Sequence, residues 1–168
     1  MADEQKYFFL NMINAGVTGL SKKAGHEGWL ELDTWDFQMN QAAQPNTGAG
    51  TPTKTSATGT FSFSIKHNGP RMFKLASMGS FIKSAITFDA ERAGMLGTAG
   101  GTSNLVYFQL IFNKVALSMR SLYGDDGQKT EHVELAFESV QMVYKPVVNG
   151  AVGSAITKTY DAKQNTVI

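Results

Sequence analysis

The sequence contains no cysteine. Disulfide bonds, thiolate zinc sites and cysteine nucleophiles are therefore excluded, and no covalent cross-link can hold the fold together. An excess of one charge is also missing, because the sequence has 15 Lys and Arg residues and 14 Asp and Glu residues. The basic residues are scattered along the sequence. A nucleic-acid-binding protein would cluster its basic residues, so we expect no nucleic-acid partner.

Long hydrophobic runs are lacking near the N-terminus, where the apolar residues 7–10 are interrupted by Asn11. A signal-peptide core needs about 7–15 apolar residues, and a membrane-spanning helix about 20. We therefore expect no signal peptide and no membrane insertion. A protein of this kind that leaves the cell would need another export route.

Motifs for catalysis and cofactor binding are missing as well. The Gly-rich stretch 94–103 lacks the spacing of a phosphate-binding loop, and no Gly-x-Ser-x-Gly elbow occurs. His26, His67 and His132 lie far apart, with no cysteine to complete a metal site. We expect no enzymatic activity, no metal and no cofactor.

The residues that are present predict a single domain that is mainly β. A chain of 168 residues with 42% hydrophobic content can build one core. Apolar residues recur mostly with a period of two between clusters of turn-forming residues, which is typical of half-buried strands. The predicted strands cover residues 6–14, 28–40, 59–67, 81–92, 104–122, 129–145 and 155–161.

One short helix is predicted to begin at Pro70 and to end at Gly79, since proline suits the first helical position and glycine suits the residue after the last turn. Met72, Leu75 and Ala76 would share the face that docks on a sheet. Residues 42–59 form a polar loop that has too few apolar residues to pack a core of its own. A loop of this length in a compact domain usually has a function.

The buried face changes parity within the long predicted strands. The odd steps run from Leu32 to Trp35, from Phe112 to Val115 and from Phe137 to Val140. A bulge, or the passage of a strand from one sheet to another, produces such a step and bends the strand. We therefore predict an antiparallel β-barrel of two packed curved sheets, with one short flanking α-helix and a long extended loop.

Acidic and aromatic residues concentrate in the stretch GHEGWLELDTWDFQMNQ. On a continuous strand Glu31 and Asp33 point the same way, about 6.5–7 Å apart, which is near the separation of paired glycosidase carboxylates. Leu30 and Leu32 must take the buried face, however, so we expect the acids to lie outward in water or at an interface. Trp29 shares their parity, and could lie over a neighbouring strand, anchor a protein contact or stack on a sugar.

The order of several segments carries a further signal. These segments are YFFLNM, HEGWLELDTW, FSFSIKHNGPRMFKLASMG, VYFQLIFNKVALSMRS, HVELAFESVQMVYKP and NGAVGSAITKTYDAKQN. In their order and spacing, over nearly the whole chain, they resemble the Hcp family, the haemolysin co-regulated proteins of bacterial type VI secretion systems. The chain departs from the family pattern at Asn68, Gly69 and Pro70, where relatives have Asp and Ser-Pro, and at Tyr160, where relatives often have Trp.

The resemblance implies a β-barrel protomer that assembles into a homohexameric ring, with rings stacking into a hollow tube. In the family, a contractile sheath wraps this tube, a spike caps it, and the lumen of some rings binds effector proteins. Such a subunit is made in the bacterial cytoplasm and is then secreted from the cell by the type VI machine. The implied role is structural and involves no catalysis.

The resemblance also assigns the long polar loop to contacts with an adjacent subunit or ring. Together with Trp29, Glu31 and Asp33, the candidate interface residues are Gln44, Pro45, Asn46, Thr47, Thr51, Pro52, Thr53 and Lys54. Two alternatives stay open at this point. One is a tail-tube protein of a phage-like contractile machine, and the other is a carbohydrate-binding β-sandwich that uses Trp29 and Trp35.

Overall fold

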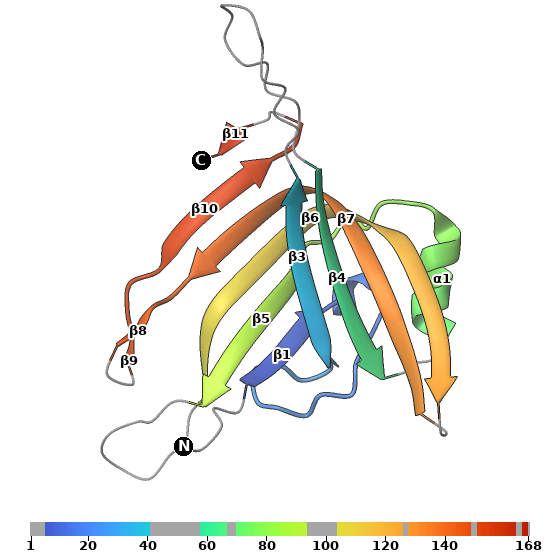
Figure 1. Ribbon diagram of the computed structural model, residues 1–168, viewed down its shortest axis with the longest axis horizontal. Helices are drawn as coiled ribbons and strands as arrows, with labels where there is room; N and C mark the ends of the chain where they lie inside the picture. Colours follow the sequence, from blue (N-terminus) through green and yellow to red (C-terminus); the bar gives the residue numbers. More distant parts are fainter. Residues whose placement is uncertain are drawn as a thin grey trace, which may run out of the picture.

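The structure is mainly β, as the alternating pattern predicts (Figure 1). The computed structural model describes residues 6–40, 58–66, 70–93, 104–125, 128–148, 151–163 and 166–167. The strands are β1 (Lys6–Asn11), β2 (Leu30–Glu31), β3 (Thr34–Asn40), β4 (Thr58–Lys66), β5 (Ile86–Ala93), β6 (Asn104–Asp125), β7 (Gln128–Tyr144), β8 (Val147–Val148), β9 (Ala151–Val152), β10 (Ile156–Asp161) and β11 (Thr166–Val167). A 3₁₀ turn, η1 (Ile13–Ala15), follows β1, and the helix α1 (Pro70–Met78) follows β4.

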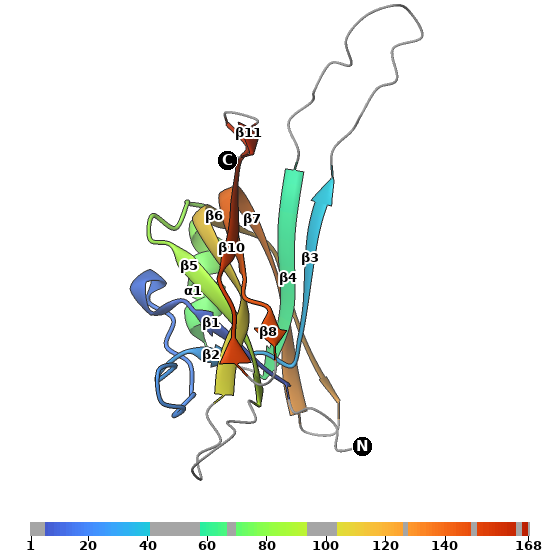
Figure 2. The same ribbon diagram turned by 90° about the vertical axis from the view of Figure 1, so that its left-hand side faces the viewer.

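The strands form one antiparallel sheet of nine strands that curls into a half-barrel, and β8 and β9 form a separate small hairpin. One layer has the order β2, β1, β5, β6, β7, β10, β11. The other layer consists of β3, β4 and the remaining halves of β7 and β6, because residues 130–136 of β7 pair with β4 and residues 139–144 pair with β10. Figure 2 shows β3 and β4 standing on one side and β1 and β5 on the other. The two predicted sheets are therefore one sheet whose longest strands run through both layers.

The long strands bend together at one place. Lys114 of β6 has a left-handed backbone with φ of 49°, and Asn113 pairs with Ser139 of β7. Phe112 and Val115 are both buried, so two consecutive residues of β6 point outward between them. On β7 the same occurs between Phe137 and Val140, which confirms the predicted parity steps and explains them as one shared corner.

A second irregularity in β6 escaped the sequence pattern. The pairing of β6 with β7 shifts by one residue between Leu117 and Met119. The hydroxyl of Ser118 donates to the Glu134 carboxylate at 2.8 Å at this bulge. The extra residue increases the local bend of the strand, which helps the sheet to curl.

The predicted strand over residues 28–40 is wrong as one continuous strand. Its first part, β2, pairs with β1, whereas its second part, β3, pairs with β4. The chain crosses from one layer to the other between them, at Leu32 and Asp33. The step from Leu32 to Trp35 thus marks a change of layer rather than a bulge within a strand.

Aromatic rings from both layers meet in the core. The ring of Trp35 on β3 lies 4.8 Å from the ring of Phe88 on β5 and 5.9 Å from that of Phe8 on β1. Phe61 on β4 packs against Phe88 and against Phe112 on β6, with ring centroids 5.1 and 5.0 Å apart. Such pairs add to the hydrophobic burial that holds two sheet layers together.

The helix α1 packs against β6 and inserts the fully buried Met72 into the core. Leu75 packs against the core as predicted, but Ala76 is exposed, because the side of α1 that faces the sheet is narrower than expected. The predicted strand 6–14 is too long at its end, because β1 ends at Asn11, and the predicted strand 81–92 begins too early, because β5 begins at Ile86. Within the described residues, no helix combines the length and apolar character needed to cross a membrane.

Candidate functional site

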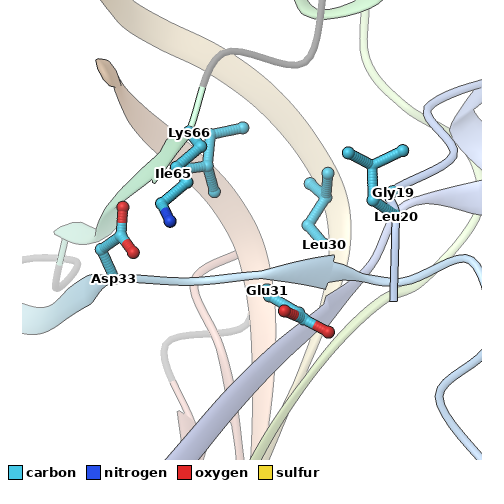
Figure 3. Close-up of a pocket in the computed structure, with 7 residues that line it drawn as sticks. All are labelled: Gly19, Leu20, Leu30, Glu31, Asp33, Ile65 and Lys66. Carbon is cyan, nitrogen blue, oxygen red and sulfur yellow. The ribbon is translucent and has the colours of Figure 1, made fainter. Parts of the chain in front are cut away.

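Glu31 and Asp33 are exposed at the crossing between β2 and β3, as their parity predicts. The main-chain N–H of Asp33 donates to the carbonyl of Ser64 on β4 at 2.9 Å, and this bond fixes the start of the second layer. In Figure 3 the two carboxylates extend to opposite sides of the chain trace. The expectation that they point the same way is therefore wrong, because it assumed a continuous strand where the chain changes layers.

A hollow of about 150 Å³ lies beside this crossing (Figure 3). It is lined by Gly19, Leu20, Leu30, Glu31, Asp33, Ile65 and Lys66. Leu20 is 84% exposed at its rim. A second hollow of about 410 Å³ is lined by Tyr7, Phe8, Phe9, Lys23, Glu31, Leu32 and Asp33. The two acids thus stand between two hollows that each offer apolar and charged groups.

Trp29 is half-buried and precedes this crossing. Its ring meets the ring of His26 edge-on, with centroids 4.6 Å apart, and its carbonyl accepts a hydrogen bond from the N–H of Ser21 at 3.3 Å. Gly19 lies so close that a Cβ at its position would collide with the Trp29 carbonyl. The backbone around Trp29 is therefore tightly packed, while part of its side chain stays accessible.

A buried polar cluster holds this region in place. On β5, Phe88 and Ala90 face the core, so Asp89 and Glu91 face the other way and are covered by residues 16–29. His26 from that covering segment stacks on Phe9 of β1, with ring centroids 4.5 Å apart. His26, Asp89 and Glu91 are only 5%, 5% and 3% exposed.

The contacts within this cluster compensate the buried charges. His26 Nε2 lies 2.9 Å from Asp89 Oδ2, and the amide of Gln109 donates to Asp89 Oδ1 at 2.7 Å. His26 Nδ1 lies 3.3 Å from Glu91 Oε1, an ion-pair distance that lacks hydrogen-bond alignment. Glu91 also pairs with the ammonium of Lys23. Buried carboxylates are costly unless they are paired, so the cluster fastens residues 16–29 onto the sheet.

Lys23 connects the cluster to the exposed acids. Its ammonium lies over the rings of Tyr7 and Phe9, 4.7 and 5.0 Å from their centroids. Partial burial lowers the pKa of Lys23, and the nearby carboxylate of Glu31 partly offsets this effect. The exposed crossing and the buried cluster are thus electrostatically coupled.

Sequence reasoning missed this cluster, because it treated His26 as an isolated histidine. A signal was present in β5, where Asp89 and Glu91 alternate with Phe88 and Ala90, but nothing in the sequence shows that a distant segment covers them. The cluster combines a histidine with two carboxylates, yet their burial keeps a substrate away, which suits a clamp better than a catalytic group. Among the described residues, no group of His, Asp and Glu has the arrangement of a metal site.

A second buried charge sits near α1. Glu131 of β7 is fully buried, and its carboxylate is met by Arg120 of β6 at 3.2 and 3.3 Å. The Arg120 guanidinium also lies over the ring of Phe73, 5.9 Å from its centroid. This pair ties α1 to the β6–β7 hairpin. The other candidate interface residues, Gln44 to Thr47 and Thr51 to Lys54, lie outside the described residues.

Residues 9–144 match the family model for the type VI secretion system effector Hcp. The chain belongs to the Hcp family. The family match confirms the resemblance that the order of the sequence segments indicated. The curled antiparallel sheet with one flanking helix is the fold of this family. The comparison with curated proteins finds no match.

Solved structures of Hcp proteins align with nearly the whole chain. Hcp1 from Salmonella typhimurium is 25% identical, with a TM-score of 0.74 over 97% of this chain and 99% of that one. Hcp2 from Salmonella typhimurium is 24% identical, with a TM-score of 0.63 over 95% and 98%. A type VI secretion system effector from Yersinia pestis is 18% identical, with a TM-score of 0.60 over 94% and 99%.

Proposed function

We propose that this Hcp-family protein is a structural subunit of the type VI secretion inner tube, which assembles into hexameric rings that stack. The observation that carries the proposal is the family match over residues 9–144 together with an alignment to 97% of the chain. A tube subunit acts by packing against copies of itself rather than by chemistry on a substrate. Sheath and spike proteins would be its partners outside the ring, and effector proteins its partners in the lumen.

The half-barrel supports assembly through its open edges. Within the described part of the chain, β3 pairs only with β4, so its other edge carries unpaired main-chain groups. Such edges promote aggregation unless another strand or chain covers them. Packing in a closed ring of identical subunits would cover them without forming open fibres.

The crossing between β2 and β3 is our candidate for a contact between subunits. It combines the exposed Leu20, Glu31 and Asp33 with the half-buried Trp29. The buried cluster under residues 16–29 keeps these side chains on a rigid base, which lowers the entropy lost when a partner binds. The residues 44–47 and 51–54 belong to the same proposal as contacts to an adjacent subunit or ring.

The carbohydrate-binding alternative loses support from the position of Trp35. Its ring lies between the layers and contacts the rings of Phe8, Phe61, Phe88 and Phe108. A sugar platform needs an open aromatic face, which Trp35 does not offer. No observation favours a phage-like tail tube over a type VI tube.

A secretion assay tests the proposed function. In a bacterium that carries this gene and a type VI gene cluster, we expect the protein in the cytoplasm and in the medium. Deletion of the sheath gene should abolish its appearance in the medium while the cytoplasmic amount is unchanged. A cytoplasmic enzyme, followed in parallel, controls for lysis. Equal export with and without the sheath would overturn the proposal.

A further inference from the structure

The helix α1 carries apolar side chains on two sides. Met72 and Leu75 face the core, as expected for a helix packed on a sheet. The outer side also bears large apolar residues, since Phe73 is 60% exposed and Met78 is 56% exposed. A surface helix that packs on one face normally has polar residues on the other. The outer side of α1 therefore departs from this pattern by exposing large apolar side chains to solvent.

Exposed apolar side chains also occur just after the end of α1. Positions 70, 73, 74, 77 and 78 lie on the side of α1 away from Met72. Phe81, which follows the helix after the left-handed Gly79, is 65% exposed. Pro70, Arg71, Phe73, Lys74 and Ser77 line a shallow groove of about 360 Å³. We name Phe73, Met78 and Phe81, with this groove, the outer helix surface. Figure 1 shows α1 at the outer side of β6 and β7.

The charges around this surface have one sign. Residues 70–85 contain Arg71, Lys74 and Lys83 and no acidic residue, and all three cations are exposed. Arg120 adds a guanidinium over Phe73, although its own charge is paired with Glu131. A partner with carboxylates beside apolar side chains would complement both the charge and the apolar groups.

We propose that the outer helix surface docks an acidic segment of a different protein, one that carries large apolar side chains. Two copies of this surface facing each other would bring like charges together, which disfavours it as a contact between identical patches. A lipid surface fits less well, because basic clusters that recognise anionic lipids usually hold about 4–8 Lys and Arg residues. The proposal goes beyond the tube function and does not depend on it.

A peptide-binding experiment tests this inference. The probe is a fluorescent synthetic amphipathic helix of Glu, Leu and Phe, and its binding to the full chain, in the assembly that it adopts, is followed by anisotropy. We expect binding that weakens with added salt. The same peptide with Lys in place of Glu should not bind. No binding of the Glu peptide, or equal binding of both peptides, would overturn the proposal.

Variants locate the binding. The double substitution Phe73→Ser and Phe81→Ser should raise the Kd by about tenfold or more, as expected for buried aromatic anchors. Val148→Ser removes another exposed apolar side chain, on β8, and should leave the Kd unchanged. Lys74→Glu with Lys83→Glu should also raise the Kd, whereas the matched control Lys158→Glu should not. An unchanged Kd in both double variants would show that the peptide binds elsewhere.

Two further measurements test whether a second copy of the chain or a membrane, rather than an acidic segment, covers the outer helix surface. If Phe73→Ser with Phe81→Ser changes the oligomeric state in sedimentation, the surface is a contact between copies, and the inference is wrong. If the wild type co-sediments with anionic vesicles, the variant does not, and the acidic peptide fails to bind, the occupant is a membrane, which also overturns it. Unchanged circular dichroism and melting of the variant exclude misfolding as the cause of a lost signal.

Discussion

Lys114 and Glu138 face each other at the corner where β6 and β7 bend together, and their side chains form an ion pair with Nζ and Oε1 2.7 Å apart. Lys114 has the left-handed backbone that lets β6 place two successive residues outward, and Glu138 occupies the matching outward step on β7. The corner is thus set by the left-handed backbone of Lys114 on β6 and by the ion pair that joins Lys114 to Glu138 on β7. It directs each half of the hairpin into a different layer.

The backbone at Lys114 predicts an unusual order of stability. A φ of 49° costs a residue with a Cβ roughly 1 kcal/mol relative to glycine. Lys114→Gly and Lys114→Ala both lose the ion pair, so the difference between them isolates the backbone. We expect the glycine variant to have a roughly fivefold larger folding equilibrium constant in urea denaturation. A more stable alanine variant would mean that the corner relaxes to an ordinary extended backbone.

The pKa values of Lys114 and Lys23 should lie on opposite sides of the ordinary lysine value, above it for Lys114 and below it for Lys23. The hydrogen bond and charge of Glu138 raise the pKa of Lys114, so its contribution to stability is present below pH 10.5 and is lost as the pH rises through the higher folded value. Burial lowers the pKa of Lys23, so the unfolded chain binds more protons just below pH 10.5 and stability rises there with pH.

Nuclear magnetic resonance of the lysine side chains measures both directions in one titration. We expect the Lys23 side chain to lose its proton at a pH below the reference value of 10.5 for lysine, and Lys114 at a pH above it. In Glu138→Gln, the pKa of Lys114 should fall toward the reference value, although the charge of Asp161 still raises it, while Lys23 stays unchanged. A Lys114 that titrates at the reference value in the wild type would contradict the ion pair.

Removal of His26 should loosen the segment that carries Trp29. His26→Ala leaves Asp89 and Glu91 buried with fewer partners, and breaking such a group costs about 3 kcal/mol in the free energy of unfolding. Denaturation by urea checks the loss, and hydrogen exchange should rise first in residues 16–29. The control Lys22→Ala changes an exposed neighbour and should have little effect.

A compensating variant sharpens this test of the cluster. In the His26→Ala background, Asp89→Asn removes the carboxylate that has lost its histidine partner, while Glu91 keeps its pair with Lys23, and should restore part of the stability. If the neutral amide instead destabilises the protein further, Asp89 is satisfied without His26, and His26 does not compensate its charge.

Reversal of the acids at the layer crossing should affect assembly rather than folding. Glu31→Lys with Asp33→Lys changes exposed side chains, so the free energy of unfolding of the protomer should shift by less than about 0.5 kcal/mol for each site. The concentration at which rings half dissociate should rise by about tenfold or more, as measured by sedimentation. Glu27→Lys is the matched exposed control. Intact rings in the double variant would remove this surface from the proposed interface.

Local patterns predicted much of the fold. The period of two located the strands, and Pro70 and Gly79 bracketed α1. The parity steps at Phe112 and Phe137 predicted curvature, because a buried face cannot change sides without a bend. These signals depend on neighbours in the sequence, so they are readable without the structure.

Pairing between distant segments could not be predicted in the same way. The steps in β6 and β7 form one corner only because Asn113 pairs with Ser139, and the step at Leu32 marks a change of partner strand. Both depend on register, which a single strand does not encode. His26 was missed for the same reason, since its partners lie on β5. The exposure of Glu31 and Asp33 was predictable from parity. The opposed directions of their carboxylates were not, because they follow from the layer crossing.

Native mass spectrometry of the purified protein at high concentration tests the central claim most directly. A ring subunit should give a dominant species of six chains, with further rings from stacking as the concentration rises, and hexagonal rings in negative-stain images of the same sample. A strict monomer over the whole concentration range, with a folded circular dichroism spectrum and no rings, would contradict the account.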